Sequence, residues 1–147
     1  MALTDFQEAL LTTFISELEE FTDELDNDIV ALEHNPDDVE LINKIFRAYH
    51  SIKSSAGIVG YKSISDFTHI IETVFEKIRQ SEVKIDNNIT SGLLDSNDIL
   101  RRFLDGIQEN SNVTESQLLT SELQDKIQKV KSIFTRYYHG HEIANKD

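Results

Sequence analysis

The spacing of apolar residues is the feature of this sequence that most limits its fold. Through most of the chain these residues recur every three or four positions, which places them on one face of an α-helix. No useful length of sequence alternates with period two, so no β-strand is predicted. Short polar breaks separate five predicted helices, at about residues 4–33, 36–55, 63–80, 87–109 and 114–139.

Long helices with short connections become antiparallel neighbours. We therefore expect an all-α fold, an antiparallel up-down four-helix bundle over about residues 4–109, with a fifth C-terminal helix at about 114–139. Residues 1–139 then form one domain, and 140–147 form a flexible tail. The apolar faces that build the core are expected to include Phe6 and Val39. The low content of 5 glycines and 1 proline in 147 residues agrees with long helices.

Several residues are predicted to mark helix ends. Capping-box spacing occurs at three predicted starts: Thr4 with Gln7, Thr114 with Gln117, and, as a weaker variant, Ser63 with Asp66. Pro36 suits the first position of the second helix, with Asn35 as its N-cap. Gly57 and Gly60 are expected to adopt positive φ in a turn over residues 56–61.

The charge of the chain is strongly negative and unevenly distributed. Its 14 basic and 27 acidic residues give a net charge of −13, and residues 1–43 contain 13 acids and no Lys or Arg. This balance argues against nucleic-acid binding through neutralised phosphates. The favoured interpretation is a solvated helix face that keeps the protein soluble. The alternative is a repulsive surface that selects partners with a basic side.

Composition also excludes some chemistry and locations. The chain has no cysteine, which excludes disulfides, thiolate metal sites and cysteine nucleophiles. No apolar run approaches the roughly 20 residues of a membrane span. The first residues lack the basic region of a signal peptide. A soluble cytoplasmic protein is the expectation.

His50 is the candidate reactive residue. Arg47 and Lys53 lie three residues before and after it, on the same helical face. If the second and third helices form a hairpin that turns near residues 58–59, His50 lies level with about residue 68. His69 is then roughly opposite, and Glu72 lies about 4.5 Å further along the axis.

That register suggests a chemical role for each group. If Glu72 accepts a hydrogen bond from Nδ1 of His50, Nε2 becomes the free and more basic nucleophile. The carboxylate also stabilises the positive charge that develops on the ring when Nε2 attacks phosphorus. Lys53 can neutralise incoming phosphoryl oxygens, and Arg47 could add to that effect or simply lie in solvent.

These residues also carry a family resemblance. The stretch PDDVELINKIFRAYHSIKSSAG, followed by GY and then by FTHIIETVFEKIR, resembles the histidine phosphotransfer domain of chemotaxis histidine kinases of the CheA type. The matching positions are His50, Ser51, Ile52, Lys53, Ala56, Gly57, Thr68, His69 and Glu72. The resemblance is close over residues 14–80. Ser54 departs from it, because glycine is common there, and Ile58-Val59 replaces a Thr-Phe type pair.

The resemblance implies a function and a set of roles. His50 is the phosphoacceptor, Glu72 orients and activates it, Lys53 stabilises phosphate, and His69 supports this network. A separate ATP-binding kinase domain supplies the phosphoryl group, and an aspartate of a CheY- or CheB-like response regulator removes it. The expected partner-binding residues are Arg47, Ser51, Ser54, Ser55 and Gly57. The domain itself is expected to bind no metal or cofactor and to be monomeric, while its partner domains use ATP and Mg²⁺.

Alternatives remain open from the sequence. The chain is either the first domain of a larger kinase, which the resemblance favours, or a stand-alone transfer protein. A di-metal bundle is disfavoured, because such sites use Glu-x-x-His pairs from two helices. Here His69-x-x-Glu72 occurs once, in the reverse order, and Lys53 would repel a cation. A helical interaction bundle with an inert histidine is the third possibility.

Overall fold

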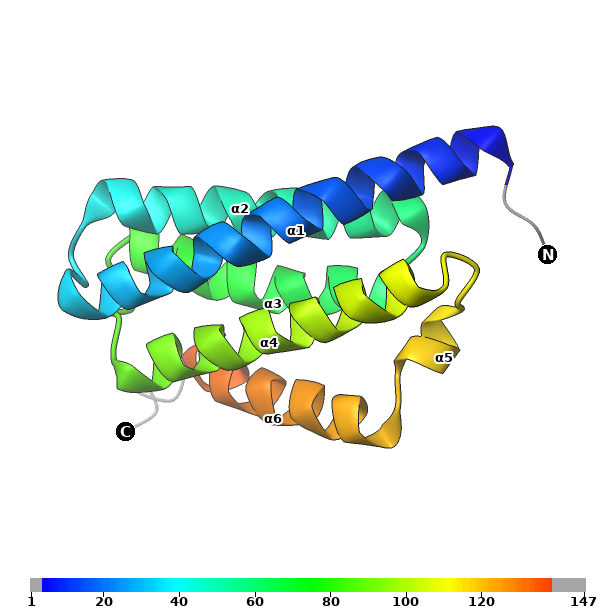
Figure 1. Ribbon diagram of the computed structural model, residues 1–147. Coiled ribbons are helices and arrows are strands. Elements are labelled where there is room, and N and C mark those ends of the chain that lie inside the picture. The colour runs from blue at the N-terminus through cyan, green and yellow to red at the C-terminus, as the bar shows by residue number, and fades with distance from the viewer. Residues whose placement is uncertain (1–3, 139–147) are drawn as a thin grey trace.

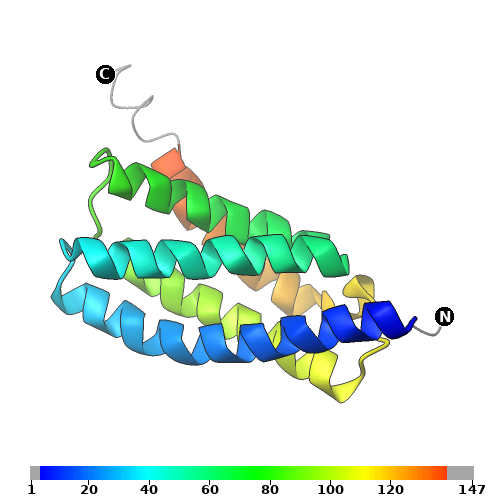
Figure 2. The same cartoon turned by 90° about the horizontal axis from the view of Figure 1, so that it is seen from above.

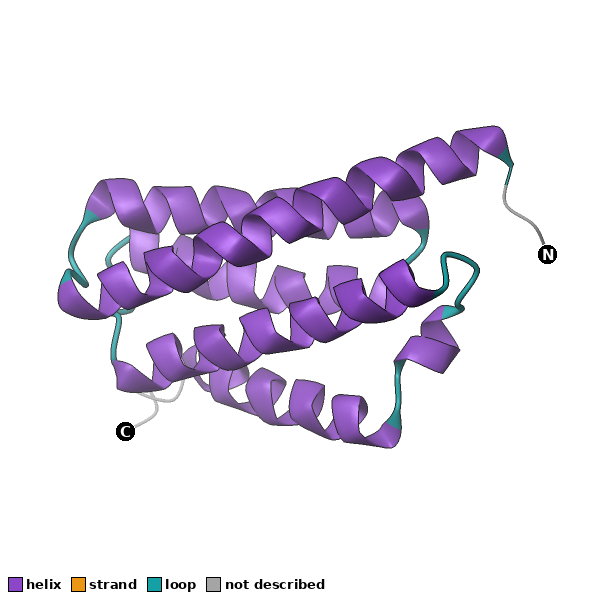
Figure 3. Ribbon diagram, viewed as in Figure 1, coloured by secondary structure: helices purple, strands orange, loops and turns teal. Residues whose placement is uncertain are grey.

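The structure is a computed structural model that describes residues 4–138, and these residues form an all-α bundle without strands (Figure 3). The helices are α1 Asp5–His34, α2 Val39–Val59, α3 Lys62–Arg79, α4 Asn87–Glu109, α5 Glu115–Leu118 and α6 Ser121–Tyr138. The predicted fold class is confirmed, because α1 to α4 form the up-and-down bundle and a C-terminal helix packs alongside (Figure 1). Among these helices, none is long and apolar enough to span a membrane.

The packing pairs explain how the site helices are supported. Figure 2 shows α2 between α1 and α3, and α2 packs against both of them. Helix α4 packs against α1, while α6 packs against both α3 and α4 and so links these two helices. Phe134 of α6 is fully buried, and a Cβ atom at Gly92 of α4 would lie only 3.0 Å from its ring. Glycine at this position therefore allows α6 to approach α4 closely.

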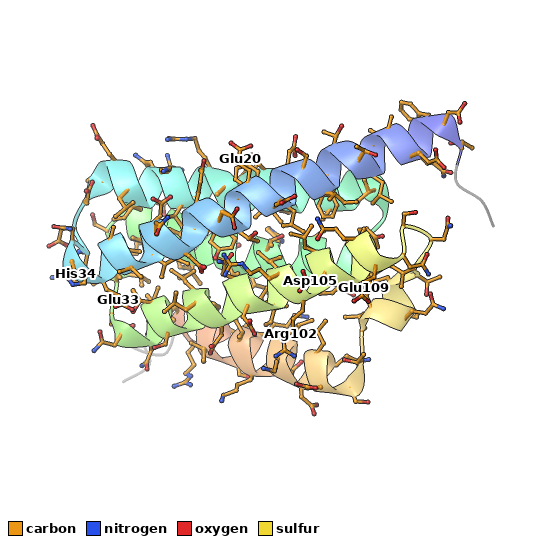
Figure 4. All side chains as sticks on the ribbon, viewed as in Figure 1. Glu20, Glu33, His34, Arg102, Asp105 and Glu109 are labelled. Carbon is orange, nitrogen blue, oxygen red and sulfur yellow. The ribbon has the colours of Figure 1, made fainter. Side chains whose placement is uncertain are left out.

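A buried polar cluster fixes α4 against α1. Asn97 is fully buried, and its Nδ2 donates to the carbonyl of Thr22 at 2.9 Å and to Oδ1 of Asp26 at 2.6 Å. Arg101 also donates to the Thr22 carbonyl, at 3.1 Å, and forms an ion pair with Asp26. Nearer the surface, Arg102, which is labelled in Figure 4, forms an ion pair with Glu122 of α6 at 3.1 Å. Such directional bonds specify one register between helices that apolar contacts alone would leave less defined.

The predicted start of α2 is wrong by three residues. Pro36 is not its first residue, and Asn35 is instead the C-cap of α1, with its N–H bonded to the carbonyl of Ala31. The N-cap of α2 is Asp38, whose carboxylate accepts from the N–H of Leu41 at 3.1 Å. Several residues in this loop can cap a helix, and the chain uses the last of them.

The turn between α2 and α3 is shorter than predicted. Helix α2 continues to Val59, so Gly57 is helical, and of these two glycines only Gly60 adopts positive φ, at 90°. The predicted cap at Ser63 is also wrong, because α3 begins at Lys62 without a side-chain cap. The α2 helix ends on Gly60 in the left-handed conformation, with the N–H of Tyr61 bonded to the carbonyl of Ala56 at 2.9 Å.

The predicted fifth helix is divided in two. The capping box at Thr114 and Gln117 forms, but it caps only the four residues of α5. Thr120 then accepts a bond from the N–H of Leu123 through its side chain, at 3.2 Å, and α6 starts just after it. The favourable threonine cap explains the new helix start. Residue 139 and the predicted tail, 140–147, lie outside the described residues.

Two predicted core residues are exposed. Phe6 is 72% exposed and Val39 is 67% exposed. Each lies in the first turn of its helix, and Figure 1 shows the start of α1 extending past the rest of the bundle. The capping box predicted at Thr4 and Gln7 is confirmed.

Candidate functional site

The site forms on the α2–α3 hairpin and depends on its register. The midpoint of the connection between Val59 and Lys62 lies at Gly60 and Tyr61. His50 is therefore level with about residue 71 of α3, rather than with residue 68 as the sequence suggested. The longer α2 helix thus brings Glu72, and not His69, opposite His50.

The predicted contact between His50 and Glu72 is present. Nδ1 of His50 lies 3.0 Å from Oε1 of Glu72, and Nζ of Lys53 lies 2.7 Å from Oε2 of the same carboxylate. An ionised carboxylate can only accept hydrogen bonds, so Nδ1 carries the proton. In the neutral ring, Nε2 then holds the lone pair, and no described residue forms a hydrogen bond with it.

The three side chains differ in their access to solvent. The His50 side chain is 55% exposed, whereas Lys53 is 25% exposed and Glu72 is only 13% exposed. The carboxylate is thus covered while the ring that it contacts remains open to a reactant. Water competes little for a hydrogen bond to such a covered carboxylate.

The ionisation of Glu72 follows from its surroundings. Burial raises the pKa of its carboxyl group, but the hydrogen bonds and charges of Lys53 and His50 together outweigh this effect. The pKa of Glu72 therefore lies below its ordinary value. The group therefore remains an anion at neutral pH and can accept from Nδ1 without itself carrying a proton. Lys53 is already paired with this anion, which the sequence did not predict.

A hollow of about 340 Å³ lies beside His50, between α1 and α2. Its lining residues are Glu17, Phe21, His50, Ser51, Ser54 and Ser55. Three of the five residues predicted to contact a partner are therefore in it. Arg47 and Gly57 are exposed on α2 but do not line it. Sequence reasoning missed Glu17 and Phe21, because the apolar and acidic pattern of α1 does not show which residues face His50.

His69 is exposed on α3, and no hydrogen bond among the described residues joins its ring to His50 or Glu72. Its carbonyl accepts a bond from Oγ1 of Thr73 at 3.0 Å. The supporting role predicted for His69 stays a prediction. Within residues 4–138, no group of three or more His, Asp or Glu side chains is arranged to hold a metal ion.

Comparison with known proteins identifies the family of this chain. The sequence model of the Hpt domain family matches residues 9–133. The chain belongs to the Hpt domain family. It is 33% identical over 150 residues to the chemotaxis protein CheA of Borreliella burgdorferi, an alignment that covers 99% of this chain and 17% of that protein. The chain therefore spans only about a sixth of the length of the curated relatives it matches.

Two solved structures extend the similarity to the fold. The CheA phosphotransferase domain from Thermotoga maritima has a TM-score of 0.66 and 34% identity, covering 71% of this chain and 99% of that one. The solution structure of the histidine phosphotransfer domain of CheA has a TM-score of 0.70 and 30% identity, covering 85% and 91%. Both relatives are named as phosphotransfer domains of CheA.

Proposed function

We propose that this domain carries phosphoryl groups in a chemotaxis-type two-component system, with His50 as the acceptor. The observation that carries the proposal is the hydrogen bond between Nδ1 of His50 and the covered carboxylate of Glu72, on a ring that is 55% exposed. That geometry directs the Nε2 lone pair away from the Glu72 carboxylate. Membership of the Hpt family and similarity to named CheA phosphotransfer domains support it.

The proposed first step is attack of Nε2 on the γ-phosphorus of ATP held by a kinase domain. The Nε2–P bond forms, the bond from phosphorus to the bridging oxygen breaks, and ADP leaves. The imidazole ring becomes positively charged, and Glu72 stabilises it through the Nδ1–H bond. Lys53 keeps Glu72 anionic, and its remaining N–H groups can face phosphoryl oxygens.

The second step passes the group to a response regulator. An aspartate oxygen of the regulator attacks phosphorus, the Nε2–P bond breaks, and His50 returns to its neutral form. The regulator is expected to dock over the hollow lined by Ser51, Ser54 and Ser55. These side chains are small enough to let a second active site approach His50. In this proposal the domain carries the phosphoryl group and does not catalyse the transfer by itself. Its partner domains, in the cytoplasm, bind ATP and Mg²⁺.

Incubation with the ATP-binding domain of a CheA-type kinase and labelled ATP tests the proposal. We expect acid-labile, alkali-stable phosphate on the parent domain and none on His50→Gln. His34→Gln is the matched control, because His34 lies at the far end of α1, exposed and away from the site (Figure 4). Phosphate of that kind on His50→Gln, at the parent level, would show that His50 is not the acceptor.

A further inference from the structure

The His50 ring has a second neighbour besides Glu72. Phe46 lies one turn earlier on α2, with its ring centroid 6.3 Å from that of His50 and an angle of 19° between the two planes. The guanidinium of Arg79, from α3, lies over the Phe46 ring at 4.4 Å from its centroid. Arg79 is in turn held by Glu76, with Nη1 donating to Oε2 at 3.0 Å. A continuous set of contacts therefore joins α3 to the His50 ring through Phe46.

Glu72 alone does not fix the orientation of the imidazole. A single hydrogen bond at Nδ1 holds one atom and decides where the proton lies, but the ring can still tilt about that contact. The ring is 55% exposed, so little else confines it. A flat side chain packed nearly parallel to it limits this tilt. Phe46 is itself only half-buried, and a cation over its face restricts its own movement.

We infer that Phe46, held by Arg79, is a positioning residue for the phosphoacceptor His50. This inference rests on the proposed function. The lone pair of Nε2 lies in the plane of the ring, so the tilt of that plane sets the direction in which Nε2 attacks phosphorus. In-line transfer depends steeply on such alignment, and small displacements lower the rate strongly. Glu72 selects the tautomer, while Phe46 and Arg79 fix the plane.

Phe46→Leu is the direct test, because leucine keeps an apolar side chain without a flat face. We expect the rate constant for phosphorylation by a CheA-type kinase domain to fall about three- to tenfold, with KM for the domain unchanged. Phe46→Tyr should keep the parent rate constant. Arg79→Gln should lower it about two- to threefold, and Arg79→Lys, which keeps the cation, should lower it less.

Two controls match these changes elsewhere on the molecule. Phe6→Leu repeats the Phe46→Leu change at a side chain that is 72% exposed near the start of α1. Arg136→Gln repeats the Arg79→Gln change at an exposed position of α6. Both should keep the parent rate. Urea denaturation of each variant confirms that the bundle remains folded under the assay conditions.

A second readout does not depend on a kinase. Relaxation of the His50 ring carbons, measured by ¹³C NMR, should show a more mobile ring in Phe46→Leu and the parent amplitude in Phe46→Tyr and Phe6→Leu. An unchanged rate in Phe46→Leu overturns the inference, and so does a slower rate with an unchanged ring. If the parent domain takes no phosphate at His50, the proposed function fails, and the NMR comparison still decides whether Phe46 orders the ring.

Discussion

Replacement of Glu72 by glutamine should lower the rate of phosphorylation at His50 more than replacement by alanine. One oxygen of the carboxylate accepts from His50 Nδ1 at 3.0 Å, and the other forms an ion pair with the Lys53 ammonium at 2.7 Å. A glutamine amide has one oxygen and one NH₂ group, while the Lys53 ammonium can only donate. The amide oxygen should therefore face Lys53 and the NH₂ group should face Nδ1. Donation to Nδ1 moves the ring proton to Nε2 and removes the nucleophilic lone pair.

The magnitude follows from the bonds involved. Loss of a hydrogen bond to a charged group costs about 1.5–3 kcal/mol, which corresponds to a rate of phosphorylation roughly 10–150-fold lower in Glu72→Ala. In Glu72→Gln the amide also stabilises the wrong tautomer by about 0.5–1.5 kcal/mol. This adds a further factor of about 2–12. The isosteric change is thus the more damaging one.

Single-turnover phosphorylation with a kinase domain and ATP measures both rates. The ¹⁵N NMR spectrum of the ring nitrogens identifies the tautomer without any kinase, and we expect Nδ1–H in the parent domain and Nε2–H in Glu72→Gln. Circular dichroism should show the parent helix content in both variants. The reasoning is refuted if Glu72→Gln reacts faster than Glu72→Ala, or if its ring keeps the proton on Nδ1.

Three further predictions concern stability and are measured by urea denaturation. Gly60→Ala should lower the free energy of unfolding by about 1–2 kcal/mol, because an L-residue is strained at the φ of 90° found there. Gly57→Ala should raise the free energy of unfolding by about 0.5–1 kcal/mol, because Gly57 lies within a helix and has room for the added Cβ. If Gly57→Ala were the less stable of the two variants, the turn would be placed wrongly. Asn97→Ala should lower the free energy of unfolding by about 2–4 kcal/mol, because it removes two hydrogen bonds of a buried amide and leaves a cavity. The control Asn112→Ala, at an exposed position, should change it by less than about 0.5 kcal/mol. Equal effects would contradict a structural role for the buried amide. Since the pKa of Glu72 is lowered in the fold, its contribution is present above the ordinary value of 4.5 and is lost as pH falls below it. The stability difference between the parent domain and Glu72→Ala should therefore shrink as the pH falls below 4.5, and a constant difference would argue against this linkage.

The sequence was sufficient for the fold class and for the central contact of the site. Helical periodicity is repeated over many turns, so errors of a few residues at helix ends do not change which faces are apolar. The same periodicity places His50 and Glu72 on facing sides of one hairpin. Their separation along the axis was predicted only within about three residues, since the end of α2 was placed at residue 55 instead of Val59. That error made His69 the expected neighbour.

Contacts between helices distant in sequence could not be predicted in the same way. They depend on crossing angles and on the reach of long side chains, which periodicity does not specify. Oγ of Ser55 donates to the Glu17 carboxylate at 3.0 Å, but other acids on α1 have equivalent sequence surroundings. The contact between Arg79 and Phe46 could not be predicted for the same reason, because it depends on how far a long α3 side chain reaches toward α2. Competition between neighbouring caps likewise decided the start of α2, where Asp38 is used instead of Asn35.

The distribution of exposure across the site fits the proposed exchange with two different partners. In the proposed function the group that meets a kinase and then a regulator is the His50 ring, which is 55% exposed. The group that sets its tautomer is Glu72, and it is 13% exposed. A partner that approaches the ring therefore does not need to touch the carboxylate, and the hydrogen bond at Nδ1 can persist through both transfers. In the proposed function this chain supplies the nucleophile, its tautomer and the charges of Glu72 and Lys53, so the metal and nucleotide chemistry can differ between partners without any change in the carrier.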